Sequence, residues 1–184
     1  LIAQSAFLTF YPTLMLDTYD MSLRWTGGIL ATSTIAGGLS PLLVSYTVMK
    51  IGGRRRILQA LGILMAGTYI ALTLTDSAPI LIGLAILNGL SWGFYPLLSA
   101  VPFHLPEIRP REVAVASAFI MTMTFAEDVI GPMVAGFLDE LLGDLREALI
   151  IESFGALSLC LAGMLLRFPI EEAGPEHRET AKEN

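Results

Sequence analysis

The chain has 184 residues, of which 54% are hydrophobic and only 15% are charged. Soluble domains carry about 25% charged residues, and the low charge content and net charge of −6 disfavour a disordered chain, a coiled coil and a nucleic-acid-binding protein. Cys160 is the single cysteine, which excludes an internal disulfide framework, and two histidines add little material for a zinc site. Composition leaves open whether the apolar residues form a soluble core or membrane spans.

Six apolar segments follow one another along the chain, with short polar connectors between them. Runs of about 18 or more residues with few charges are typical of membrane helices, whereas a soluble bundle carries charges every few residues on its exposed faces. We predict an all-α, polytopic membrane bundle of six transmembrane helices within residues 1–168, followed by a polar tail at 169–184. The predicted spans, in chain order, are 1–16, 25–49, 57–75, 79–103, 113–138 and 148–166.

The first segment is shorter than the others. At 1.5 Å per residue, a run of about 16 residues reaches roughly 24 Å, less than the roughly 30 Å hydrocarbon core of a bilayer. It also begins at Leu1, without an initiator methionine or a flanking basic residue. We therefore expect the chain to be a fragment or to lack upstream sequence.

Basic residues concentrate in alternate connectors. Nine of the 11 lie in connectors 50–56 and 104–112 and in residues 167–184, whereas the opposite side of the predicted bundle holds Arg24 and Arg146. Loops rich in Lys and Arg stay on the cytoplasmic side. The pattern predicts a multi-pass cell-membrane protein with both ends of the chain in the cytoplasm.

Two short patterns recur in the two halves of the chain. Phe-Tyr-Pro-x-Leu begins at Phe10 and again at Phe94, and small-Pro-x-x-apolar-small begins at Ser40 and again at Gly131. Because each copy would hold three spans, the second lies inverted in the membrane, which is an architecture of secondary transporters (a 3+3 inverted repeat). The alternative is that aromatic-Pro pairs recur by chance in apolar helices.

The connector after the second span carries a basic motif. Residues 50–56 read Lys-Ile-Gly-Gly-Arg-Arg-Arg and resemble the Asp-Arg-x-Gly-Arg-Arg signature of the major facilitator superfamily, with Lys50 and Ile51 replacing the Asp-Arg pair. The glycines allow a tight turn, and the arginines anchor at anionic headgroups or at the neighbouring half. We expect a gating or topology role rather than substrate binding, with simple positive-inside anchoring as the alternative, for Gly52, Gly53, Arg54, Arg55 and Arg56.

A second motif lies in the fifth span. Gly131, Pro132 and Gly136 resemble the Gly-Pro-x-x-Gly-Gly pattern of the same family, with Ala135 replacing the first of its paired glycines, and we assign them to helix packing. The resemblance implies the C-terminal six-helix half of a twelve-helix transporter, whose N-terminal half would be a missing partner. Residues 106–115 also resemble cyanate-permease-like members.

In this superfamily, the helices that match the first and fourth spans line a central cavity. The fourth span carries polar and aromatic residues at i, i+4, i+7 and i+11, which is one face of a helix. The first span carries a similar face. The alternative for the aromatic residues is an interfacial belt. The predicted cavity residues are Asn88, Trp92, Tyr95, Ser99, Gln4 and Tyr11.

Glu127 and Asp128 stand inside the predicted fifth span. Ionisable residues within a span are costly and usually functional. Adjacent helical residues point about 100° apart, so one can face a cavity while the other faces a partner helix. We predict that one of them carries a proton; the alternative is a structural pair bonded to a basic group in the missing half. Glu152 is expected to reach the interface in a structural role, with Arg146 as its neighbour.

These patterns together predict a secondary active transporter that moves a small solute by alternating access, coupled to protons, within the lipid bilayer. No nucleophile, metal cluster or phosphate-binding loop favours an enzyme, and we expect no cofactor and no nucleic-acid partner. One alternative is a non-transporting membrane receptor, assembly module or truncated paralogue. A membrane-embedded enzyme is a third hypothesis.

Overall fold

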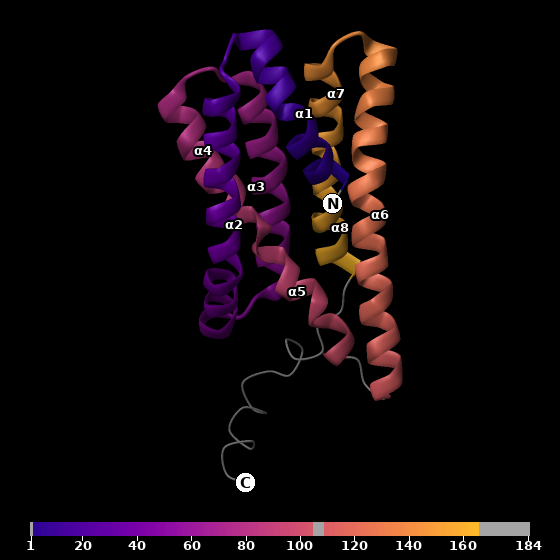
Figure 1. The fold of residues 1–184 in the computed structure, drawn as a ribbon. Helices are drawn as coiled ribbons and strands as arrows, with labels where there is room; N and C mark the ends of the chain where they lie inside the picture. Colours follow the sequence, from indigo (N-terminus) through magenta and orange to yellow (C-terminus); the bar gives the residue numbers. More distant parts are fainter. Residues whose placement is uncertain (1, 105–108, 166–184) are drawn as a thin grey trace.

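The computed structural model describes residues 2–104 and 109–165, and these residues form a bundle of six helical rods without strands (Figure 1). The all-α bundle predicted from the sequence is confirmed. The predicted tail at 169–184, and residues 106–108 of the segment before the fifth span, lie outside the described residues. The helices are α1 (Ile2–Tyr19), α2 (Leu23–Ile51), α3 (Arg54–Leu74), α4 (Ala78–Ser91), α5 (Tyr95–Ser99), α6 (Pro110–Leu142), α7 (Leu145–Ser153) and α8 (Ser158–Leu165), with 3₁₀ turns η1 (Trp92–Phe94), η2 (Val101–His104) and η3 (Phe154–Leu157).

Five of the six rods in the described part of the chain are long and apolar enough to cross a membrane. They are α2, α3, the rod that joins α4 to α5 and η2, α6, and the rod that joins α7 to α8. The remaining rod, α1, has 18 residues, and its first turn lies beside the middle of α6 in Figure 1.

The fourth and sixth rods are interrupted, although the sequence predicted continuous spans. In the fourth rod, Pro96 has no N–H to donate and its ring clashes with the carbonyl of Trp92, four residues earlier. The backbone tightens there into η1 before continuing as α5. The sixth rod is interrupted at η3, which contains Gly155 but no proline. Pro12 leaves α1 unbroken.

The closest helix pairs have the symmetry that the predicted repeat requires. α2 packs most extensively on α4, and α1 packs on α6. In an inverted repeat the first, second and third rods correspond to the fourth, fifth and sixth. Under this correspondence the α2–α4 pair becomes the pair of α6 and α1, and the pair of α3 and the α7–α8 rod, which also pack on each other, is converted into itself. The inverted repeat proposed from short sequence patterns therefore has a counterpart in the packing.

Small residues allow α2 and α4 to approach closely. A Cβ atom added at Gly89 would collide with the Ser33 carbonyl and lie 2.6 Å from the Ala36 Cβ. The Ser33 hydroxyl donates a hydrogen bond of 3.0 Å to the carbonyl of Ala85, across the same interface. Without a hydrophobic driving force between helices in lipid, such close contacts and hydrogen bonds hold membrane helices together.

Candidate functional site

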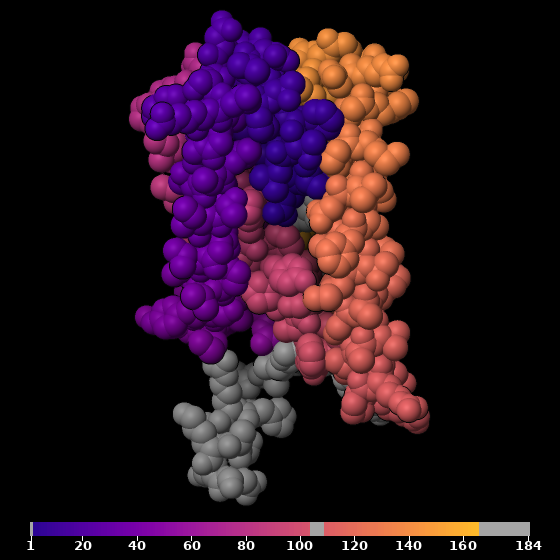
Figure 2. Space-filling view, viewed as in Figure 1, coloured from indigo at the N-terminus to yellow at the C-terminus, as the bar shows by residue number. Residues whose placement is uncertain are grey.

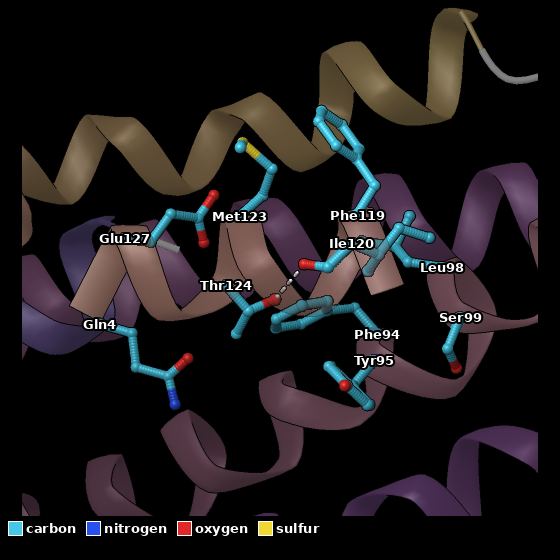
Figure 3. Close-up of a pocket in the computed structure, with 10 residues that line it drawn as sticks. All are labelled: Gln4, Phe94, Tyr95, Leu98, Ser99, Phe119, Ile120, Met123, Thr124 and Glu127. Carbon is cyan, nitrogen blue, oxygen red and sulfur yellow. Dashed lines mark hydrogen bonds between the residues drawn. The ribbon is translucent and has the colours of Figure 1, made fainter. Parts of the chain in front are cut away.

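A cavity of about 240 Å³ lies between α1, the η1–α5 segment and α6. In Figure 2 the visible face of the bundle is hollowed between α2 and α6, below α1, and α5 lies in the hollow. Both triplets of rods contribute to the lining, since α1 belongs to the first and α5 and α6 to the second. The lining residues are Gln4, Phe94, Tyr95, Leu98, Ser99, Phe119, Ile120, Met123, Thr124 and Glu127 (Figure 3).

One face of α6 serves both the cavity and the packing against α1. Ile120, Thr124 and Glu127 line the cavity, and Gly131 and Ala135, further along the same stripe, are the buried residues of this helix. Spacings of three and four residues keep all five on one side of a helix. The cavity therefore opens where this stripe of α6 is no longer covered by α1.

The two adjacent acids of α6 occupy different environments. Glu127 is half-buried and lines the cavity, whereas Asp128 is exposed on the outside of this bundle. The separation follows from the roughly 100° between neighbouring helical residues. The backbone carbonyl of Glu127 also accepts a 2.9 Å hydrogen bond from the hydroxyl of Ser5 on α1.

The six predicted cavity residues divide into two groups. Gln4, Tyr95 and Ser99 line the cavity. Tyr95, on α5, is 43% exposed. The polar groups of the lining are the neutral hydrogen-bonding groups of these three residues and of Thr124, together with the carboxyl group of Glu127. Asn88, Trp92 and Tyr11 do not line it, which differs from the expectation.

Asn88 and Trp92 instead pack inside this bundle. Asn88 is 1% exposed, and its side-chain nitrogen donates a 3.1 Å hydrogen bond to the hydroxyl of Thr68 on α3. The indole ring of Trp92 lies against Gly37 of α2, where an added Cβ would collide with it. The 3₁₀ turn explains the split, since three residues at about 120° each rotate the following helix by about 60° relative to an α-helix.

Tyr11 is also part of the packed core rather than a cavity wall. It is fully buried, and its ring stacks on Phe7 with a centroid separation of 4.5 Å. Phe7 in turn lies 4.5 Å from the ring of Tyr69 on α3. The Phe-Tyr-Pro pattern therefore produces a buried tyrosine in the continuous α1 and an exposed one in the interrupted fourth rod.

Several cavity residues were not singled out in the sequence. The apolar ones are Phe94, Leu98, Phe119, Ile120 and Met123. Counting back from Glu127 in steps of three and four residues would have found those on α6. No pattern in the sequence distinguishes the others from lipid-facing residues.

The basic motif forms the turn between α2 and α3. Gly52 and Gly53 have φ values of +72° and +75°, a conformation that strains residues with a side chain. Arg54, Arg55 and Arg56 form the first turn of α3. Lys50 lies over the ring of Tyr46, 5.9 Å from its centroid. These cations lie at the end of the bundle and not among the residues that line the cavity.

The Gly-Pro motif of α6 lies where this helix crosses α1. A Cβ on Gly131 would collide with the Ser5 hydroxyl and the Ile2 carbonyl, so no larger residue fits without moving α1. Gly136 is less constrained, with its nearest atom 3.9 Å away on Phe10. Pro132 lies inside the helix without breaking it.

Glu152 differs from the expectation that it reaches the interface. It is 6% exposed, and neither carboxylate oxygen has a hydrogen-bond partner among the described residues. Arg146 does not pair with Glu152. The guanidinium of Arg146 lies 5.2 Å from the ring centroid of Tyr19 on α1. Glu152 lies on the side of α7 that packs against other helices of the bundle. The hydropathy of the segment does not indicate which side of α7 is packed.

The described residues contain no group of three or more His, Cys, Asp and Glu side chains that could hold a metal ion. Comparison with known proteins assigns a family instead. The family model described as Major Facilitator Superfamily matches residues 1–184. The probable galactarate/D-glucarate transporter GudP of Bacillus subtilis (strain 168) is 25% identical over 173 residues, which cover 90% of this chain and 37% of that protein. The chain thus spans little more than a third of this relative's length, and no solved structure matched it.

Proposed function

Because the chain belongs to the major facilitator superfamily, a family of multi-pass membrane transporters, we propose that it is part of a secondary active transporter that moves a small solute by alternating access. The observation that carries this proposal is the cavity. It lies between helices of both inverted triplets and holds an acid that belongs to an apolar span. Transporter sites form at such repeat interfaces near the middle of the membrane.

A second six-helix bundle would complete this site. The hollow face in Figure 2 lies between α2 and α6, and the cavity between α1, the η1–α5 segment and α6 lies within it. The relative's much greater length supports such a partner bundle. In this arrangement the two bundles rock about the cavity, and the turn that carries Arg54, Arg55 and Arg56 lies on the cytoplasmic side, as positive-inside bias requires.

Glu127 is the proposed proton carrier. It lines the cavity together with Gln4 and Thr124, whereas Asp128 points away from it. A carboxyl group that meets the solute path can take up a proton on one side of the membrane and release it on the other. Asp128 would then have a structural role at the contact with the second bundle.

The cavity suits a hydroxylated solute. Gln4, Tyr95 and Ser99 offer neutral donors and acceptors, and among residues 2–104 and 109–165 no basic side chain lines the cavity. A carboxylate on the solute would therefore have to be bound by the second bundle. The name of the relative makes galactarate and D-glucarate the first solutes to test.

Uptake of these sugar diacids into vesicles containing the full-length protein, with and without an inward proton gradient, tests the proposal. Glu127→Gln should abolish the response to the gradient, while the matched neighbour Asp128→Asn should retain it. An unchanged gradient response in both variants would reject Glu127 as the carrier. Absence of uptake for every solute tried, with cysteines at the cavity protected from both sides of the membrane, would favour a non-transporting module.

A further inference from the structure

Glu152 is a second intramembrane acid, and the cavity does not account for it. It lies on α7, seven residues after the helix begins, and is not among the residues that line the cavity. Its side chain is 94% buried, since 6% is exposed, and both carboxylate oxygens are shielded. Neither oxygen accepts a hydrogen bond from any residue in 2–104 or 109–165.

The helices that surround Glu152 are those that pack on α7, namely α1, α3 and α6. Gly62 of α3 lies against Ala156 and Leu159 of the sixth rod. Because the two rods are antiparallel, Glu152 lies about one turn further along α3 than Gly62, at the level of Met65 and Ala66. Both of these residues are buried.

The titratable and charged groups on these elements do not neutralise the carboxylate. Tyr11 on α1 and Tyr69 on α3 are the buried titratable residues. The acids of α6 would repel a second negative charge rather than stabilise it: Glu112, Glu127, Asp128, Asp139 and Glu140. The arginines of these helices lie in first turns, Arg54, Arg55 and Arg56 in that of α3 and Arg111 in that of α6. On α7 itself, Glu147 is also acidic, and the guanidinium of Arg146 lies over the ring of Tyr19 on α1, which also carries Asp17.

Burying an ionised carboxylate without a partner is among the largest penalties a protein can incur. The same side chain with a proton on one oxygen is neutral, and its burial is far less unfavourable. Surrounding lipid offers no water to relieve the penalty, and acids retained at such depth in a span are usually functional. The environment of Glu152 therefore favours the carboxylic acid over the carboxylate.

A break in the rod lies next to this acid. Ser153 ends α7, with its hydroxyl donating a 2.7 Å hydrogen bond to the carbonyl of Leu149, and η3 begins at Phe154. A stretch of 3₁₀ helix inside a longer rod often marks a hinge. Bending at η3 would move Glu152 relative to α1 and α3 without unwinding either helix.

We propose that Glu152 is a proton-binding site inside the bundle, separate from the cavity. At rest it is a neutral carboxylic acid sealed between α7, α1 and α3. When the rod bends at η3 and water enters, the O–H bond breaks, the proton passes to a water molecule and the carboxylate remains. This site goes beyond the cavity acid of the proposed transport cycle and does not depend on it.

Infrared spectroscopy of the full-length protein in lipid vesicles tests the resting state. The carbonyl stretch of a carboxylic acid is distinct from that of a carboxylate, and it shifts when the acidic proton is replaced by deuterium. At neutral pH, Glu152→Gln should remove one such band, and the control Asp128→Asn should leave that band in place. If Glu152→Gln removes no carboxylic acid band, Glu152 is ionised and the proposal fails.

A separate measurement checks that the Glu152→Gln variant folds. Glu152→Gln has nearly the shape of the protonated acid, so its thermal unfolding midpoint should match that of the natural protein. If it does not fold, Glu152→Asp provides the same test, because it should shift the band rather than remove it. An unshifted band in Glu152→Asp would assign the acid to another residue and overturn the proposal.

The rate at which the Glu152 carboxyl proton exchanges for deuterium tests whether water reaches this side chain. The Glu152 band should shift at least tenfold more slowly than amide groups in the exposed connectors, and adding a transported solute should accelerate the shift. Immediate exchange, at the rate of an exposed group, would overturn the sealed site. The carboxylic acid band and its exchange rate without added solute do not require transport, so their outcome is distinguishable from failure of the cavity proposal.

Discussion

Replacing Gly89 by alanine tests the close approach of α2 and α4. The added methyl would lie 2.6 Å from the Ala36 Cβ and 2.8 Å from the Gly37 nitrogen, both well inside the 3.4 Å at which ordinary contact begins. The obstructing atoms are backbone and a methyl group and cannot rotate away. The two helices must therefore separate, which also lengthens the 3.0 Å hydrogen bond from Ser33.

The expected effect has two parts. Overpacking costs about 1–3 kcal/mol, and weakening an interhelical hydrogen bond in a membrane protein adds about 0.6 kcal/mol. Gly83, on the same helix, is the matched control, because an added Cβ there meets nothing within 4 Å. Gly83→Ala should stabilise the protein by about 0.5–1 kcal/mol, since glycine weakens a helix.

Unfolding of the purified protein in mixed micelles, with increasing denaturing detergent, measures the two variants side by side. The free energies of unfolding of Gly89→Ala and Gly83→Ala should differ by about 2–4.6 kcal/mol. Equal unfolding midpoints for the two variants would refute the reasoning. They would mean that the small-residue interface of α2 and α4 is not under packing constraint.

Three further experiments follow from the packing and the cavity. Gly131→Ala should lower the free energy of unfolding by about 1–3 kcal/mol, while Gly136→Ala, whose nearest atom is 3.9 Å away, should be close to neutral; equal losses would contradict the close α1–α6 contact. Asn88→Ala should cost about 0.6–1.7 kcal/mol in the same assay, because it removes the bond to Thr68, and a neutral result would count against that bond. In a Cys160→Ala background, which removes the single native cysteine, a water-soluble thiol reagent should label Tyr95→Cys at least tenfold faster than Asn88→Cys, and equal rates would contradict the different burial of the two positions.

The number of rods and their helical type could be predicted because charge is absent from long stretches of the sequence. The boundaries differ most at α6, which runs from Pro110 to Leu142 rather than over 113–138. Its start is extended because the side chain of Glu112 accepts a 2.9 Å hydrogen bond from the backbone of Arg109. Its end continues through Asp139 and Glu140, since charged residues at the ends of a span can remain helical.

The candidate site was less accessible to prediction. Spacing identified a face of the fourth span, but the 3₁₀ turn at Trp92–Phe94 rotates the second part of that face away from the first. Periodicity describes one helix at a time, so it could not indicate that Asn88 meets Thr68 while Tyr95 meets the cavity. Hydropathy likewise could not separate the exposed Asp128 from the buried Glu152, because it carries no information about neighbouring helices.

The position of Glu127 has a mechanical consequence. Its carbonyl accepts the hydrogen bond from Ser5 that joins α6 to α1, and its side chain lines the cavity. The joint between the two helices and the acid in the solute path thus belong to a single residue. Any sliding of α6 along α1 displaces the carboxylate by a similar distance, with no intervening side chains to absorb the movement.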